Sequence, residues 1–146
     1  MIPPVGALLA LPARLAFRLR ARRPRRVRLC APARLEDGGR GLRFRLWRGG
    51  TWWPAFAVRY EGRVRAFLNR CAHRGVELDW EPGVFFSADG RALLCATHGA
   101  RYHPATGACL GGPCGGPLAV LEVEERGDGV YLKLGAGEAA EVLPGD

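Results

Sequence analysis

"NRCAHRGVELDW", residues 69–80, and "LLCATHGARYHP", residues 93–104, are the two stretches that decide the fold of this chain. The first contains Cys71 and His73 in a C-x-H box, and the second contains Cys95 and His98 in a C-x-x-H box. The chain has five cysteines and three histidines, so the boxes take two of its three imidazoles. Together they predict a metal site built from two loops.

The order of the donors along the chain favours a binuclear cluster over a single ion. Each box follows an expected strand, so two loops at the ends of hairpins can converge and offer two thiolates and two imidazoles. Zinc accepts this donor set, but zinc fingers usually pair cysteine with cysteine and histidine with histidine. Here each loop supplies one of each, which suits a [2Fe-2S] cluster with the cysteines on one iron and the histidines on the other.

These stretches resemble the Rieske iron–sulfur proteins, and most closely the small soluble ferredoxin-like type. The resemblance rests on "CAHRG", "CATHGARY" and "TGACLGGPC" followed by a final β hairpin, and it covers residues 27–134. It implies one [2Fe-2S] cluster per chain, with Cys71, His73, Cys95 and His98 as the iron ligands and no catalytic residue. The implied fold is all-β, an antiparallel β sandwich or barrel with an inserted cluster-binding subdomain.

Alternating apolar and polar residues predict the strands of such a fold. We expect strands at 27–31 and 42–47, and hairpins within 55–68, 85–94 and 118–134. No strong helix signal follows the N-terminal region. The expected organisation is a flexible arginine-rich extension at 1–25, a Rieske domain at 26–136 with cluster-binding loops at about 69–116, and a loose C-terminal tail at 137–146.

The positive charge of the chain is concentrated at its N-terminal end. Eight of the 22 basic residues lie within residues 1–28, where there is no acidic residue, which leaves 14 basic against 14 acidic residues elsewhere. A nucleic-acid-binding domain would be basic throughout, so nucleic acid is not an expected partner. The extension is expected to be flexible, with a weak contact to an anionic surface as the alternative.

The same region shows no sign of an export signal or a membrane anchor. The chain has no run of 18 apolar residues, and the N-terminal charges follow the short apolar stretch rather than precede it. We therefore expect a cytoplasmic location and a reducing compartment. Cys109 and Cys114 are then expected to be free thiols rather than a small disulfide loop, and Cys30 a small core residue.

The boxes depart from those of the high-potential relatives found in respiratory complexes. The resemblance places Val76 and Thr97 where those proteins have a bracing disulfide, and Ala100 where they have a serine that bonds a bridging sulfide. Tyr102 matches a tyrosine that bonds a cysteine sulfur. Each lost donor removes a group that stabilises the reduced cluster, so we expect a midpoint potential near or below the lower end of the Rieske range, about −150 mV rather than about +300 mV.

Other side chains near the boxes are expected to be structural. His103 is expected to be a surface residue outside the ligand set. The tryptophans are expected in the core or in packing at the domain edge, namely Trp47, Trp52, Trp53 and Trp80. A dry shell around the cluster is expected from Leu94, Leu110, Pro113 and Leu118.

The expected function is one-electron transfer by a ferredoxin-like carrier between a reductase and an oxygenase or reductase partner. Catalysis by this chain alone is not expected, since Rieske oxygenases add a second iron site in a large further domain. Two alternatives stay open at this point. One is a small Rieske subunit of a larger reductase such as nitrite reductase, and the other is a structural zinc-binding interaction domain.

Overall fold

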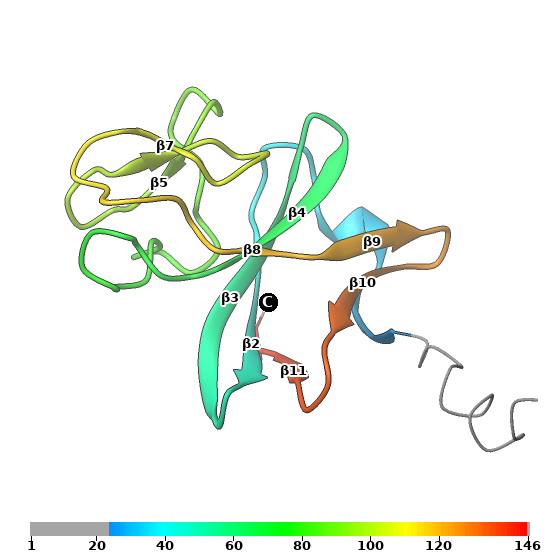
Figure 1. Ribbon diagram of the computed structural model, residues 1–146. Coiled ribbons are helices and arrows are strands. Elements are labelled where there is room, and N and C mark those ends of the chain that lie inside the picture. The colour runs from blue at the N-terminus through cyan, green and yellow to red at the C-terminus, as the bar shows by residue number, and fades with distance from the viewer. Residues whose placement is uncertain (1–23, 146) are drawn as a thin grey trace, which may run out of the picture.

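Short strands in three antiparallel sheets make up the computed structural model, which describes residues 24–145 (Figure 1). The first sheet has the order β1-β10-β9, formed by Arg25–Cys30, Gly129–Leu134 and Val123–Arg126. The second has the order β11-β2-β3-β4-β8, formed by Ala139–Val142, Leu42–Arg48, Thr51–Tyr60, Arg63–Leu68 and Val120–Leu121. The third has the order β5-β6-β7, formed by Leu93–Leu94, Arg101–Tyr102 and Cys109–Gly111. One 3-10 turn, Pro32–Arg34, follows β1, and no helix within residues 24–145 is long and apolar enough to cross a bilayer.

The predicted strands and hairpins are present, which confirms the all-β fold class. β3 and β4 pair from Ala55↔Leu68 to Tyr60↔Arg63, and β9 and β10 pair across a two-residue turn. The 85–94 hairpin is less regular than expected. It is held by a single bridge between Phe86 and Leu93 and by the hydrogen bond from the Ser87 N–H to the Ala92 carbonyl oxygen.

The structure contradicts the prediction for the C-terminal end of the chain and leaves the one for the N-terminal end untested. The prediction of a loose C-terminal tail is wrong, because β11 pairs with β2 over four residues and Ala140 and Val142 pack against the core. The sequence "AAEV" is too short and too weakly alternating to reveal an edge strand. The expected flexible extension lies outside the described residues except for Pro24 and Arg25, and Arg25 begins β1.

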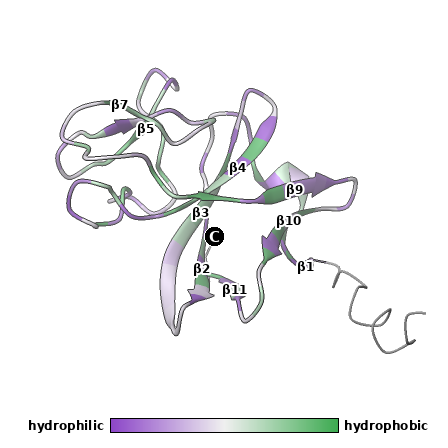
Figure 2. Cartoon of the chain, in the orientation of Figure 1, coloured by the Kyte–Doolittle hydropathy of each residue, from purple (hydrophilic) through white to green (hydrophobic). Residues whose placement is uncertain are grey.

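The domain has two separate clusters of buried side chains. The base core lies between the first two sheets and includes Phe44, Leu46 and Leu132. Figure 2 shows hydrophobic and hydrophilic residues alternating along β10, as expected when one face of a strand covers a core. The site core lies beneath the third sheet, where Phe85 stacks on Phe56 of β3 with ring centroids 3.8 Å apart. This stack joins the inserted subdomain to the base.

The tryptophans were expected in the core or in packing at the domain edge, and three of the four agree with this. Trp47 and Trp52 form an edge-to-face pair at 5.4 Å on the β2–β3 hairpin, and Trp53 is half-buried beside them. Trp80 is 75% exposed, so its predicted role in packing is wrong.

Arg59 joins three segments of the base. Its guanidinium pairs with both carboxylate oxygens of Glu125 at 2.7 and 2.8 Å. It also donates to the backbone carbonyl oxygens of Leu35, Pro32 and Gly62. The hydrogen bond from Arg59 is the main reason that the pKa of Glu125 is lowered. Because the folded-state pKa lies below the unfolded one, this contribution to stability is present above the unfolded pKa and is lost as pH falls through the folded one.

Arg59→Met is expected to lower the free energy of unfolding by about 2–4 kcal/mol, because it leaves several carbonyl groups and one carboxylate without their donor. Arg45→Met is the matched control, since Arg45 also pairs with a carboxylate, Glu141, but is 43% exposed. Arg45→Met should lower the free energy of unfolding by less than about 1 kcal/mol. Urea unfolding at neutral pH measures both, and equal losses would contradict the role given to Arg59.

Candidate metal centre

The loop after β4 holds the first box in a ring closed by two backbone hydrogen bonds. The Cys71 N–H donates to the Val76 carbonyl oxygen over 2.7 Å, and the Gly75 N–H donates to the Cys71 carbonyl oxygen over 2.8 Å. Gly75 has φ +70°, a conformation that residues with a Cβ rarely adopt. The glycine two residues after His73 is therefore what allows this ring to close, and His73 lies within it, exposed.

The loop between β5 and β6 repeats the same closure around the second box. The Cys95 N–H donates to the Ala100 carbonyl oxygen and the Gly99 N–H to the Cys95 carbonyl oxygen, both over 2.9 Å. Gly99 has φ +78°. A further hydrogen bond, from the Ala96 N–H to the Leu78 carbonyl oxygen, ties the second ring to the end of the first loop. The two boxes therefore converge, as their placement after two hairpins predicts.

The four donor side chains form an inner and an outer pair. Cys71 and Cys95 are 2% and 1% exposed, whereas the imidazoles of His73 and His98 are exposed, with ring centroids 5.4 Å apart. A zinc tetrahedron needs four donors around one point. Two thiols inside and two imidazoles outside fit a two-iron cluster better.

The two thiols differ in their tendency to ionise. Burial acts to raise the pKa of Cys71, but hydrogen bonds from the Tyr102 hydroxyl and from the His73 backbone N–H outweigh it and lower that pKa overall. Burial raises the pKa of Cys95, and the neighbouring Cys71 adds to the increase. Metal binding requires thiolates, and the hydrogen bonds to Cys71 favour its charged form.

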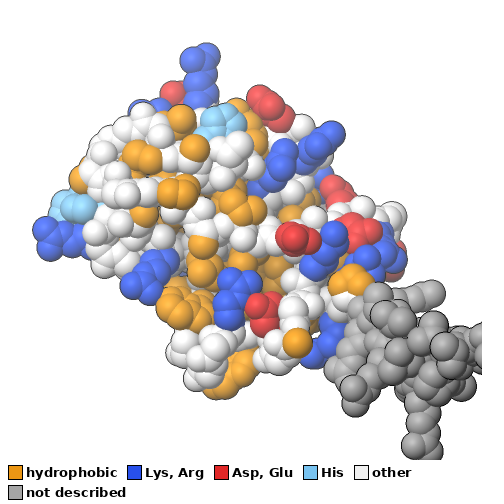
Figure 3. All heavy atoms as spheres, viewed as in Figure 1, with side chains coloured by type: hydrophobic (Ala, Val, Ile, Leu, Met, Phe, Trp, Pro, Cys, Tyr) orange, Lys and Arg blue, Asp and Glu red, His pale blue; other side chains and the backbone are white. Residues whose placement is uncertain are grey.

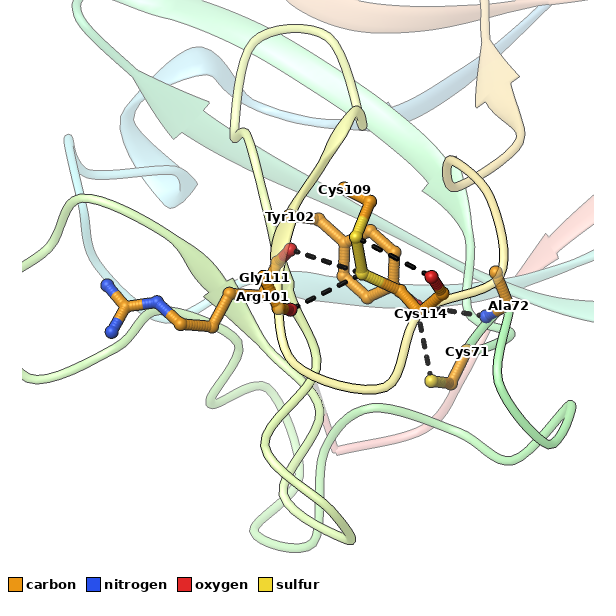
Figure 4. The surroundings of a disulfide bond; sticks show 7 residues. All are labelled: Cys71, Ala72, Arg101, Tyr102, Cys109, Gly111 and Cys114. Carbon is orange, nitrogen blue, oxygen red and sulfur yellow. Dashed lines mark hydrogen bonds between the residues drawn. A yellow bond between two sulfur atoms is a disulfide. The ribbon is translucent and has the colours of Figure 1, made fainter.

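Tyr102 is fully buried beneath the first ring, and its hydroxyl points at the backbone and sulfur of that ring (Figure 4). The hydroxyl lies 3.2 Å from the Cys71 Sγ and accepts a hydrogen bond from the Ala72 N–H over 3.0 Å. Burial, and then the bond to Cys71, raises the pKa of Tyr102 well above its usual value. The hydroxyl stays protonated and can donate to the sulfur, which confirms the contact that the resemblance implies.

Cys109 and Cys114 form a disulfide, so the prediction of two free thiols is wrong. The bond joins the first residue of β7 to the turn that follows this strand, and the two Cα atoms are 6.1 Å apart. Cys114 packs against the site core, and its sulfur lies near the carbonyl oxygens of Arg101 and Gly111 (Figure 4). The prediction rested on the compartment, which says nothing about a glycine-rich turn that brings two thiols together.

The prediction of a dry shell formed by Leu94, Leu110, Pro113 and Leu118 is partly confirmed. Leu118 is buried and Leu94 half-buried, but Leu110 is 52% exposed and Pro113 is exposed, so those two assignments are wrong. The buried apolar side chains beneath the thiols come instead from residues that the sequence did not single out, namely Val58, Leu78, Phe85 and Leu93. His103 is half-buried and lies against Tyr60, and its Nδ1 accepts a hydrogen bond from the Ala105 N–H.

Asn69 positions the first loop, a role that sequence reasoning missed. Its side chain is 2% exposed. The Oδ1 atom accepts a hydrogen bond from the Leu78 N–H, and the Nδ2 atom donates to the Asp79 carboxylate, both over 2.8 Å. The amide thus joins the start of the loop to its end. The available signal was a polar residue two positions before Cys71, directly after the end of β4.

Comparisons with known proteins agree with this geometry. The Rieske [2Fe-2S] domain model matches residues 26–122. The ferredoxin of carbazole 1,9a-dioxygenase from Nocardioides aromaticivorans IC177 is 25% identical, with 74% of this chain and 96% of that chain covered and a TM-score of 0.57. A structure described as the complex of reduced oxygenase and oxidized ferredoxin in carbazole 1,9a-dioxygenase gives 27% identity, coverage of 74% and 92%, and a TM-score of 0.56. The Sphingomonas yanoikuyae B1 ferredoxin shares the fold at 23% identity, with 76% and 100% covered and a TM-score of 0.58.

No curated protein sequence matches the chain. The family match nevertheless spans both boxes and most of the base, and the similar ferredoxins are covered almost from end to end. The chain therefore belongs to the Rieske [2Fe-2S] domain family, as an electron-transfer protein with one cluster rather than as an enzyme in its own right.

Proposed function

We propose that Cys71 and Cys95 hold the inner iron of the cluster and that His73 and His98 hold the outer iron. The observation that supports this assignment is the layering of two buried thiols beneath two exposed imidazoles 5.4 Å apart. The bound cluster supplies reversible one-electron chemistry. The residues of this chain supply the thiolates, the hydrogen bond from Tyr102 and an apolar floor that excludes water.

The two imidazoles are the route by which electrons leave and enter. They are the exposed members of the site, so a partner that touches them comes within one side chain of the outer iron. The thiols are covered by the site core and offer no comparable path. We therefore propose that a redox partner docks over His73 and His98.

The proposed partner that accepts the electron is an oxygenase, or a reductase of similar design. Support comes from the similar ferredoxin that was solved in complex with the oxygenase of carbazole 1,9a-dioxygenase. The chain would then act as the carrier between a reductase and that partner.

The first experiment tests the cofactor and its ligands. The purified full chain should be red-brown, with an iron-to-sulfide ratio near about one, and should give a rhombic EPR signal after reduction. A colourless protein that binds zinc would overturn the proposal in favour of a structural zinc domain. A second experiment tests the partner: an oxygenase encoded beside this chain should turn over only when the chain and a reductase are both present.

Ala100→Ser is expected to raise the midpoint potential, on the order of tens of millivolts, because a hydroxyl at this position can donate to the cluster and stabilise its reduced form. Ala100 is fully buried beside the second ring, so the new hydroxyl would face the site. Protein-film voltammetry of the two proteins measures the difference. An unchanged or lower potential would contradict the assignment of Ala100 to the position of the family's serine.

A cytoplasmic location stays a proposal. The disulfide between Cys109 and Cys114 removes the argument from free thiols, so the proposal now rests on the likeness to ferredoxins. Cell fractionation with an antibody to the chain tests it, and recovery from an extracytoplasmic fraction would contradict it.

A further inference from the structure

A hollow of about 420 Å³ opens directly beside the first ring. Its lining includes Cys71, His73, Arg70 and Arg74, and none of its lining residues is acidic. In Figure 3 a blue side chain lies beside a histidine at the left end of the visible face, and red side chains lie at the top, at the bottom and on the right. The site therefore carries local positive charge, although the chain beyond residue 28 has as many acidic as basic residues.

Arg70 is held in a defined position rather than extended into solvent. Its guanidinium carbon lies 5.3 Å from the centre of the Trp53 ring, a cation–π contact. It also lies so close to Gly75 that a Cβ there would be 3.0 Å from the Arg70 Nε. The indole and the glycine together fix one arginine at the edge of the hollow, and Arg74, which is exposed, supplies the second.

Within residues 24–145 these two arginines have no acidic partner, unlike several others on the domain. Arg45, Arg48 and Arg59, for example, each pair with a glutamate. In the part of the chain that the structure describes, no carboxylate forms an ion pair with Arg70 or Arg74. Their N–H groups are free to donate hydrogen bonds to an anionic group of another molecule.

We propose that this hollow receives a carboxylate side chain of the redox partner, so that the partner's docking face is acidic. The inference rests on the proposed function, because it names the partner's chemistry at the same site. A guanidinium binds a carboxylate through two parallel hydrogen bonds, which sets orientation as well as affinity. A carboxylate held between Arg70 and Arg74 would place the partner against His73, where the electron leaves.

The charge at this site should also speed the encounter. Complementary charge steers association and raises its rate most at low ionic strength. The arginine-rich segment at residues 1–28 has the same sign and would add a long-range attraction for the same class of partner. An acidic partner is thus favoured at long range and at contact.

The test uses two cobalt(III) complexes of opposite charge as one-electron oxidants of the reduced full-length protein. Tris(oxalato)cobaltate(III) presents carboxylate oxygens, and hexaamminecobalt(III) presents none. In each reaction cobalt(III) takes one electron and becomes cobalt(II), and the protein's reduced iron pair loses that electron. Stopped-flow absorbance follows the rate at low and high salt.

Arg74→Glu should slow oxidation by the oxalato complex about fivefold at low salt and should speed oxidation by the ammine complex. Arg63→Glu is the matched control, since it makes the same change in net charge at an exposed position at the opposite end of β4. It should leave both rates nearly unchanged. Equal effects of the two substitutions would mean that only net charge matters and would overturn the proposal.

A peptide of six glutamates should compete with the oxalato complex in the wild type and lose most of that effect in Arg74→Glu. Inorganic phosphate at the same ionic strength should compete less, and equal competition would indicate a phosphate site and overturn the proposal. The EPR signal of the reduced wild type and of each reduced variant distinguishes failure of the proposed function from failure of the proposal that the partner is acidic. If the reduced wild type gives no EPR signal, the proposed cluster is contradicted. If the signal is present but the oxidation rates do not depend on the charge at residue 74, only the proposal of an acidic partner is contradicted.

Discussion

Cys71→Ala should give a folded, colourless protein whose iron content falls from about two atoms per chain to nearly none. Cys71 is buried among apolar side chains, so no solvent or mobile side chain can replace its sulfur. Two of the other cysteines, Cys109 and Cys114, are joined to each other, and Cys30 lies in the base core. Iron and acid-labile sulfide analysis, with EPR after reduction, measures the loss.

Cys30→Ala is the control that makes this result specific. Cys30 is also a buried cysteine, at 9% exposure, but it belongs to β1 and packs in the base core. Its removal should leave iron, sulfide and the EPR signal at wild-type levels. A Cys71→Ala protein with a full cluster would show that Cys71 is not a ligand, and a cluster lost from Cys30→Ala would show that the assay reports folding alone.

Gly112→Ala should destabilise the domain by about 3 kcal/mol or more and make the cluster labile. Gly112 has φ +75°, and an added Cβ would lie 2.7 Å from the Gly99 carbonyl oxygen and 3.1 Å from the Ala100 Cα. Both neighbours are backbone atoms of the second ring, so no side chain can move aside. The disulfide loop would have to separate from the ring that holds Cys95.

Gly137→Ala isolates the part of this effect that comes from the backbone conformation. Gly137 also has φ +75°, but a Cβ there would meet nothing within 4 Å. Gly137→Ala should lower the free energy of unfolding by about 1 kcal/mol and should leave the rate of iron release unchanged. Urea unfolding gives the stabilities, and the rate of iron release to a chelator gives the lability of the cluster. Equal values for the two variants would contradict the close approach of the loops.

Much of the fold follows from local patterns that the sequence displays openly. The alternation in residues 42–47 and the Glu61-Gly62 turn predict β2 and the β3–β4 hairpin, because a strand with one buried face must alternate. β11 could not be predicted, since a stretch of two alanines, a glutamate and a valine becomes a strand only when the exposed edge of β2 is available. Pairing of that kind is a tertiary effect.

The site shows the same division between local and tertiary information. The spacing of the Cys and His residues, and the glycines after them, indicates two converging loops, and the structure brings the loops together through the same hydrogen-bonded rings. Exposure is harder to predict, as Trp80 and Leu110 show, because an apolar residue in an inserted subdomain has little core to enter. The disulfide depends on the path of a glycine-rich turn, which no periodicity records.

The two separate cores suggest that the domain opens in two cooperative steps. The base core involves residues from both ends of the described chain, from Leu29 to Leu134, and contains no proposed ligand. The site core contains both thiols of the proposed ligand set. Removing the iron should therefore speed amide hydrogen exchange in the cluster-binding loops while β2 and β10 stay protected. The cell could then insert or repair the cluster in a domain whose base has already folded.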